Sequence, residues 1–162
     1  MLKMNHRHQQ GLSLLEAMIA LVIISVGLLG IAALQNNALK QNNSAYWHSQ
    51  AVWMAHDMAE RIRANRSVIN TYIGIDTTNN YNQDCQTATC SAADMINADA
   101  EDWKAAVETL PAGRGIIRNP VGAPNETEIV VMWDDEGTGA AGTDCGNDPT
   151  VDLACYAITL GP

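Results

Sequence analysis

The chain has 162 residues, enough for one domain of ordinary size and an extension. Only 17% of its residues are charged, and the acids behind its net charge of −9 lie, except for Glu16, beyond Trp53. This acidic region argues against a protein that binds nucleic acid, whose affinity comes largely from phosphate neutralisation, and suits a soluble module held away from an anionic membrane surface.

The N-terminal part of the chain has the charge and hydropathy pattern of a membrane anchor. Residues 1–11 include Lys3 and Arg7 and no acid, and residues 12–34 read LSLLEAMIALVIISVGLLGIAAL. As a helix this segment would be roughly 35 Å long, enough to cross a hydrocarbon core of about 30 Å. The positive-inside rule then places the N-terminus in the cytoplasm and the acidic remainder outside, with a single pass through the membrane.

Two simpler interpretations of this segment are a cleaved secretory signal and a plain signal anchor. A secretory signal has an apolar stretch of only about 7–15 residues followed by a small-residue cleavage site. Here the stretch is longer, and Ala32-Ala33-Leu34 is followed by further helix-forming residues. Neither interpretation explains the acidic Glu16.

Glu16 is the residue that points to a function. A carboxylate within a bilayer costs about 2.5–3.5 kcal/mol on insertion scales, and such residues are usually functional. Cleavage after Gly11 would leave a positively charged amine on Leu12, one helical turn from Glu16, at the end of the helix where its dipole favours an acid. In an assembly, the carboxylate could neutralise the amine of a neighbouring subunit and set the register of the helices.

The run from Gly11 to Glu16, followed by an unbroken apolar helix, resembles the class III signal of type IV prepilins and pseudopilins. The resemblance implies that a prepilin peptidase/N-methyltransferase cuts after Gly11 and methylates Leu12, while Glu16 serves as the assembly glutamate. The family usually has phenylalanine in place of Leu12. Cleavage depends mainly on the glycine, so we expect processing to occur.

The apolar helix is predicted to continue into a half-polar one. We assign residues 1–11 to a cleaved leader, 12–38 to the transmembrane and assembly helix, and 39–68 to an amphipathic outer half. Apolar residues at spacings of three and four mark one face of that half, and the head is expected to pack on it. These residues are Trp47, Ala51, Met54, Met58 and Ile62. After Gln35 no helix breaker occurs before Gly74, which predicts a helix to about Val68, with Asp57 and Arg61 paired on its wetter side.

The outer half of this helix carries a second resemblance. Ser49-Gln50-Ala51 and the stretch of residues 55–65, which reads AHDMAERIRAN, are similar to the helix of PilV-type minor pilins. That resemblance implies a low-abundance subunit that helps to initiate a type IV pilus. Its partners would be other major and minor pilins and a tip adhesin, and its final location the fimbrium.

Residues 69–162 are predicted to form a periplasmic α+β head. A helix-start box at residues 91–94 precedes a helix that ends before Pro111. Residues 115–118, 128–133 and 155–160 read as strands, and because turns rather than helices join them, the sheet should be antiparallel. The predicted fold is type IV pilin-like: a long N-terminal helical spine with a small antiparallel β-sheet.

The four cysteines all lie in the predicted periplasmic head, where disulfides form and persist. Three pairings are compatible with four cysteines. We favour Cys85–Cys90 and Cys145–Cys155, because each pair closes a polar or glycine-containing loop, and the second would pin the acidic loop to the last strand. Zinc is the alternative, although neither spacing matches common zinc sites.

No catalytic constellation and no cofactor or metal site is indicated by the sequence. The acidic run at residues 134–137 lacks the alternating ligands of an EF-hand loop and is interpreted as a solvated turn. We therefore predict a non-enzymatic minor pilin, involved in pilus assembly and in adhesion or tip presentation. The alternatives are a minor pseudopilin of a type II secretion system and a signal-anchored periplasmic binding module.

Overall fold

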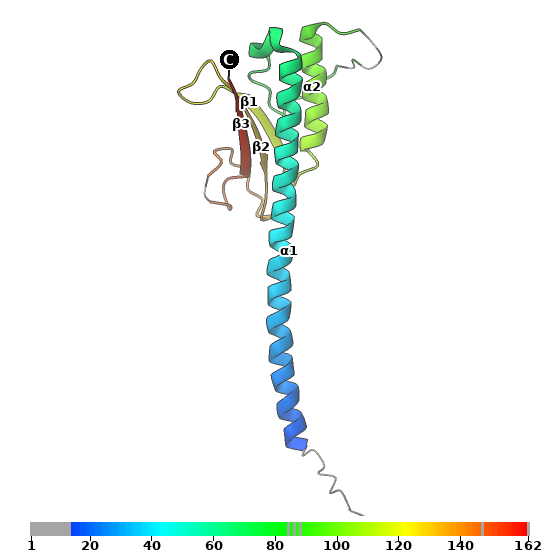
Figure 1. Cartoon of the computed structure of the whole chain (residues 1–162), viewed down its shortest axis with the longest axis vertical. Helices are drawn as coiled ribbons and strands as arrows, with labels where there is room; N and C mark the ends of the chain where they lie inside the picture. Colours follow the sequence, from blue (N-terminus) through cyan, green and yellow to red (C-terminus); the bar gives the residue numbers. More distant parts are fainter. Residues whose placement is uncertain (1–13, 84, 86, 88, 147, 162) are drawn as a thin grey trace, which may run out of the picture. The chain divides into compact units, whose positions relative to one another are not determined.

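The computed structural model describes residues 14–83, 85, 87, 89–146 and 148–161. The chain divides into two units, of which the first ends at Asn42 and the second begins at Asn43. The second unit is called the head below. The elements in chain order are α1 (Leu14–Ala64), the 3₁₀ helix η1 (Arg66–Thr71), α2 (Ala92–Val107), β1 (Arg114–Arg118), β2 (Thr127–Trp133) and β3 (Ala154–Leu160) (Figure 1).

Helix α1 contains 51 residues and supplies all the described residues of the first unit and the spine of the head. It ends at Ala64, four residues earlier than the expected end at Val68, whose backbone is non-helical within η1. No proline or glycine causes this end. Instead the Asn65 side chain donates hydrogen bonds to the Ala92 carbonyl at 2.8 Å and to the Tyr72 hydroxyl at 3.2 Å. These tertiary contacts favour a chain that turns back and buries Tyr72.

The core of the head lies between α1, α2 and one face of the sheet. The α1 side chains in the core recur at helical spacing, as the sequence predicts. They are Ala51, Met54, Ala55, Met58, Ala59 and Ile62, all of them buried. Trp103 of α2 lies in the same core, and its indole N–H donates to the Met54 carbonyl at 3.1 Å.

The sheet has the strand order β1-β2-β3 and is antiparallel throughout. Alternate residues of β2 face opposite sides, so Ile129 and Val131 enter the main core. Val130 and Met132 form a second cluster with Ala140 and Leu153 on the other face. Both faces of the central strand are thus covered, one by helices and the other by the β2–β3 loop.

The outer edge of β1 is partly covered by the segment that follows η1. Gly74, at φ +96°, donates its N–H to the Ile117 carbonyl at 2.8 Å, and Thr77 donates to the Gly115 carbonyl at 3.0 Å. Asp76 and Ile116 form an isolated antiparallel bridge there. Paired backbone groups at this edge leave less of it open to another strand.

Helix α2 begins as the sequence predicts. Ser91 is the N-cap, its hydroxyl accepts from the Asp94 backbone N–H, and the Asp94 carboxylate accepts from the Ser91 N–H, which completes a capping box. The helix ends at Val107, before Pro111, and the three strands include the predicted segments with one extra residue at the start of each. The expected type IV pilin-like α+β fold is confirmed.

Candidate functional site: the apolar helix, its glutamate and the surfaces of the head

Glu16 lies in the first turn of α1 and is exposed. It is the only ionisable residue of the described chain before Lys40. A carboxylate in the first turn faces the unpaired backbone N–H groups of the helix end, which carry the positive end of the helix dipole. The proposed cleavage and methylation site, Gly11 and Leu12, lies outside the described residues.

The first unit exposes a continuous apolar surface. Its large side chains, from Leu14 at 78% to Ile19 at 52% exposed, lie on all sides of the helix rather than on one stripe. A soluble monomer rarely exposes a contiguous apolar patch of more than a few hundred Å². This helix therefore requires lipid or other apolar helices around it. By length and composition, α1 is also the one helix of the described chain that qualifies as a membrane span.

Ser25 and Glu16 are the only polar side chains between Leu14 and Leu34, and they differ in their hydrogen bonding. The Ser25 hydroxyl contacts the Leu21 carbonyl oxygen at 2.5 Å and that of Val22 at 3.1 Å, so its polarity is satisfied within the helix. Glu16 has no hydrogen-bond or ion-pair partner among the described residues. Glu16 is thus the one group of this surface that still needs a partner of opposite charge.

Gly27 and Gly30 leave two gaps in the apolar surface. A Cβ built on either residue would meet no atom within 4 Å beyond the helix's own backbone, so neither glycine is required by a contact inside the chain. In apolar surroundings, small residues three or four positions apart let a second helix approach closely. Their placement fits a helix that packs against other helices.

In the head, Arg61 is the centre of an ion-pair network that joins α1 to α2. Its guanidinium binds Asp57 at 2.9 Å, Asp99 at 3.2 Å and Asp102 at 3.2 Å. The Tyr72 hydroxyl donates to Asp99 at 2.6 Å. The predicted pair of Asp57 and Arg61 is confirmed, and the approach of α2 adds Asp99 and Asp102 as further partners of Arg61.

The network shifts the pKa values of two of its members. Burial alone would lower the pKa of Arg61, but the hydrogen bonds from its guanidinium to Asp57 and Asp99 outweigh burial and raise it. Burial and the hydrogen bond to Asp99 raise the pKa of Tyr72 to about 12. Arg61 therefore stays charged and Tyr72 neutral at physiological pH, which suits a fixed structural link rather than acid–base chemistry.

The run of acids after β2 is more ordered than the solvated turn that the sequence analysis expected. Asp134 is buried and accepts hydrogen bonds from the backbone N–H groups of Gly139 at 2.8 Å and Thr138 at 3.1 Å. These backbone bonds, that of Gly139 first, hold the pKa of the Asp134 carboxyl below its usual range. Asp135 accepts from the Ser44 hydroxyl at 2.7 Å and from the Trp133 indole at 2.9 Å. The side chains of Asp134 and Asp135 both accept hydrogen bonds within the head, so the expectation of a merely solvated turn was wrong for these two residues.

Two disulfides join the local pairs. Cys85 and Cys90 have Cα atoms 5.6 Å apart, and those of Cys145 and Cys155 are 5.5 Å apart, both typical of disulfides. The second bond anchors the β2–β3 loop to β3, where Cys145 and Cys155 pack against the cluster of Val130 and Met132.

Within the described parts of the chain, no group of three or more histidine, cysteine, aspartate or glutamate side chains is arranged to hold a metal ion. His48 instead packs edge-on against Trp133 and Tyr156, with ring centroids 6.0 and 5.8 Å apart. His56 lies 6.4 Å from the same tyrosine. The head histidines thus have packing contacts within the fold.

Comparison with known families agrees with this arrangement. Residues 6–32 match the prokaryotic N-terminal methylation motif, and residues 33–101 match a family described as type IV pilin Tt1218. No curated protein and no solved structure gives a significant match.

The chain therefore carries a class III prepilin motif and a type IV pilin domain on a type IV pilin-like fold. Pilins are structural subunits. The motif implies processing by a prepilin peptidase and assembly with other pilins, and together with the long apolar helix it indicates a membrane-anchored pilin.

The sequence identified the apolar helix and Glu16 but missed the contacts of Arg61 with Asp99 and Tyr72. It gave no sign that Arg61 and Asp99, 38 residues apart, would meet.

Proposed function

We propose that this chain is a minor pilin of the PilV type, a low-abundance subunit that primes or joins a type IV pilus. In this proposal the chain inserts into the inner membrane with its head in the periplasm, is cut after Gly11 and is methylated on Leu12. Glu16 then neutralises the N-terminal amine of a neighbouring pilin within the filament. A tip adhesin is a further proposed partner of the head.

The observation that carries this proposal is the unpartnered carboxylate of Glu16 on a helix that is apolar on every side. Such a carboxylate opposes simple membrane anchoring, since it makes insertion less favourable. It favours assembly, because a buried charge becomes tolerable when an opposite charge lies beside it. The adjacent methylation motif supports a processing step that creates such a positive charge.

The experiment is an intact-mass measurement on protein from native membranes and from sheared surface filaments. We expect the mass of residues 12–162 plus one methyl group, less the four hydrogens of two disulfides, in both fractions. A mass that begins at Met1 and occurs only in membranes would contradict processing and assembly. It would leave a signal-anchored periplasmic module.

Deletion of the gene separates a pilus subunit from a pseudopilin of type II secretion. Loss or reduction of pili and of twitching, with normal export of secreted enzymes, is expected for the proposed minor pilin. Blocked export with intact pili would assign the chain to the secretion pseudopilus instead. Restoring the unchanged gene in the same strain is the control for effects on neighbouring genes.

A further inference from the structure

One edge of the sheet is left open. Strand β3 is the outermost strand, on the side of the sheet away from α2 (Figure 1), and only β2 pairs with it. The β2–β3 loop pairs with the chain just before this strand, where the Leu153 N–H donates to the Gly142 carbonyl at 3.0 Å. Residues 154–160 themselves make no backbone–backbone hydrogen bond to described residues outside the sheet. The N–H and C=O groups on their outer side can therefore pair with a further strand.

Strand β3 also lacks the features that usually keep an edge strand from pairing. Such strands are protected by charged side chains, proline, bulges or short length. Strand β3 has seven residues, ACYAITL, with no charge and no proline. It pairs with β2 residue for residue from Ala154 to Leu160, without a bulge. An open, uncharged edge of this length is a surface to which an extended peptide can add as a strand.

Two arginines with unused hydrogen-bond donors lie at one end of this edge. The head has six lysines and arginines, and five of them form ion pairs within the described chain; Arg66 does not. Arg63 is paired only with Glu60, and more than half of its side chain is exposed. A guanidinium offers five N–H donors, so both arginines retain donors for an acceptor from outside the chain.

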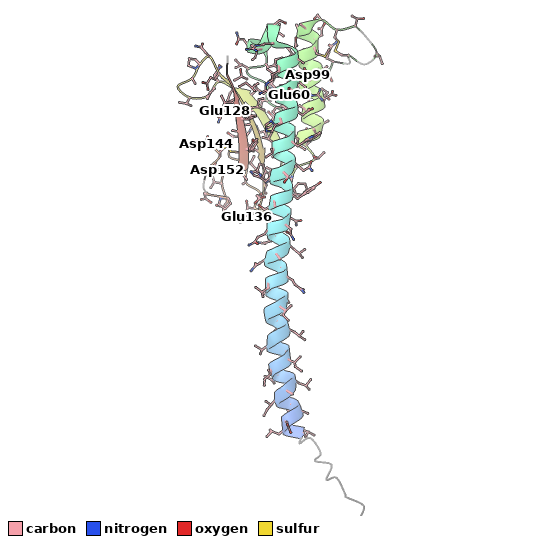
Figure 2. The ribbon with its side chains drawn as sticks, in the orientation of Figure 1. Glu60, Asp99, Glu128, Glu136, Asp144 and Asp152 are labelled. Atoms are coloured by element: carbon pink, nitrogen blue, oxygen red, sulfur yellow. A yellow bond between two sulfur atoms is a disulfide. The ribbon has the colours of Figure 1, made fainter. Side chains whose placement is uncertain are left out.

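These arginines and the end of β3 line one hollow, with a volume of about 220 Å³. We call it the arginine groove, and its residues are Arg63, Arg66, Ile69, Thr159, Leu160 and Gly161. No acid belongs to this lining. Figure 2 shows Glu136, Asp144 and Asp152 of the β2–β3 loop away from the end of the head at which α1 terminates. A strand added to β3 would thus meet positive charge beside Leu160 and negative charge towards Asp152.

We propose that β3 and the arginine groove together bind an extended acidic segment of another exported protein. The segment adds to the sheet as a fourth strand through backbone hydrogen bonds with β3, and Arg63 and Arg66 bind an aspartate or glutamate of the segment beside Leu160. Backbone pairing supplies affinity for an extended polypeptide, and the two guanidiniums select one with a carboxylate at that position. A free anion or a lipid headgroup would fill the groove but has no backbone groups to pair with the edge.

A second copy of this chain does not fit this edge. Two β3 strands that pair antiparallel would point their heads in opposite directions, whereas copies anchored by the same helix in one membrane point the same way. Two that pair in parallel would bring Arg63 and Arg66 of both copies to the same end, where like charges repel. The occupant is therefore a different protein. The contact rests on one part of the proposed function, the periplasmic head, and gives that head a surface for a partner other than a pilin.

The test is cross-linking in intact cells that make the full-length chain. In one variant the photoreactive p-benzoylphenylalanine replaces Ala157, an exposed residue of β3, and light joins it to whatever lies against the edge. In a second, Arg66→Lys places an amine in the groove, and a carbodiimide joins it to a carboxylate only when the two are in contact. We expect mass spectrometry to map both links to one protein, with an aspartate or glutamate joined to position 66. The two linked residues should lie no more than about six residues apart, since a strand rises about 3.3 Å per residue.

Matched variants define the contact. With the photoreactive residue at position 157, Arg63→Gln with Arg66→Gln should reduce the yield of the link several-fold, whereas Lys104→Gln, on α2, should leave it unchanged. The photoreactive residue in place of Glu101, an exposed residue of α2, should give no link to the same segment. The link from position 66 should also fall several-fold in 1 M salt, where the Debye length shrinks from about 8 Å to about 3 Å.

Links that are absent, that map to different proteins or to distant stretches of one protein, or that join two copies of this chain would overturn the proposal. The mass measurement on sheared filaments reads the pilus function separately. A chain of the expected mass in filaments without the two links would keep the pilus function and lose only the edge contact. Both links on a full-length chain that occurs only in membranes would support the contact and contradict the pilus function.

Discussion

Tyr72, Asp99 and Arg61 show how single side chains connect distant parts of the head. Tyr72 is fully buried after η1, Asp99 lies on α2 and Arg61 on α1, so the three tie the turn-back of the chain to both helices. A buried carboxylate is stable only when its hydrogen-bond partners are present. The link should therefore respond to pH through Tyr72.

We expect the head to lose stability at alkaline pH. The pKa of Tyr72 rises from about 10 to about 12 on folding, so its protonated form stabilises the fold fully below pH 10. That contribution, about 2–3 kcal/mol, is lost as the pH rises towards 12. Denaturant unfolding of Tyr72→Phe should lack this component of the pH dependence. Tyr46→Phe, at an exposed tyrosine, is the control and should keep it; an unchanged slope in Tyr72→Phe would contradict the prediction.

Gly115 is required by packing rather than by backbone conformation. A Cβ at this position would lie 2.5–2.9 Å from three ring atoms of the buried Trp103. Gly115→Ala should therefore lower the free energy of unfolding by about 1–3 kcal/mol, as overpacking of a filled core does. Gly161→Ala adds a methyl group where no atom lies within 4 Å and should change the same denaturant midpoint little. Equal midpoints for the two variants would rule out the steric explanation.

At the scale of elements, the β2–β3 loop forms the second wall of the sheet. It covers Val130 and Met132, is bridged to β3 by Cys145–Cys155, and pairs Gly142 with the Val151 carbonyl at 2.8 Å. Without such a cover the central strand would expose apolar side chains on one face. The loop's own apolar contribution is small, so its position depends on the disulfide and on the backbone bonds around Asp134.

Replacing both Cys145 and Cys155 with serine should loosen this loop while leaving α2 folded. Closing a loop of this length by a disulfide stabilises a fold by about 3 kcal/mol in the chain-entropy account. We expect faster hydrogen exchange at the Gly142 amide and little change at the α2 amides. The matched control replaces Cys85 and Cys90 with serine, which should leave exchange at Gly142 as it is. Exchange that rises equally across α2 would indicate global unfolding instead.

At the scale of the whole molecule, the chain combines an apolar helix, which needs lipid or other apolar helices around it, with a head that has a packed core. In the head, the apolar face of α1 is buried in the core. In the first unit, all the large apolar side chains are exposed. The fold thus separates the part that is stable by itself from the part that requires a membrane or neighbouring helices.

Glu16→Ala should separate insertion from assembly. Removal of the carboxylate makes membrane insertion more favourable, by less than the about 2.5–3.5 kcal/mol that a charge costs at the helix centre, so the variant should remain in the membrane fraction. Its amount in sheared filaments should fall sharply, because the amine of the neighbouring subunit loses its partner. Immunoblots of the two fractions measure this, with Glu101→Ala as the control. Wild-type amounts of Glu16→Ala in filaments would support a non-assembling anchored module.

The sequence by itself determined the elements whose signals are local. The apolar run around Glu16, the Ser91–Asp94 capping box and the three strand segments are each legible within a window of some ten residues, because periodicity and capping act between near neighbours. The stripe from Ala51 to Ile62 likewise predicted the face of α1 that packs in the core.

Only the tertiary structure decided where α1 stops and which charges are paired. Asn65 and the arginines of the last turn are only weak helix-ending signals. Helix α1 ends there because the Asn65 amide reaches Ala92 and Tyr72. Arg61 meets Asp99 for the same reason, because packing brings α1 and α2 together. Long-range contacts depend on the closure of large loops around a common core, and no local pattern of residues specifies which groups will then lie within hydrogen-bond distance.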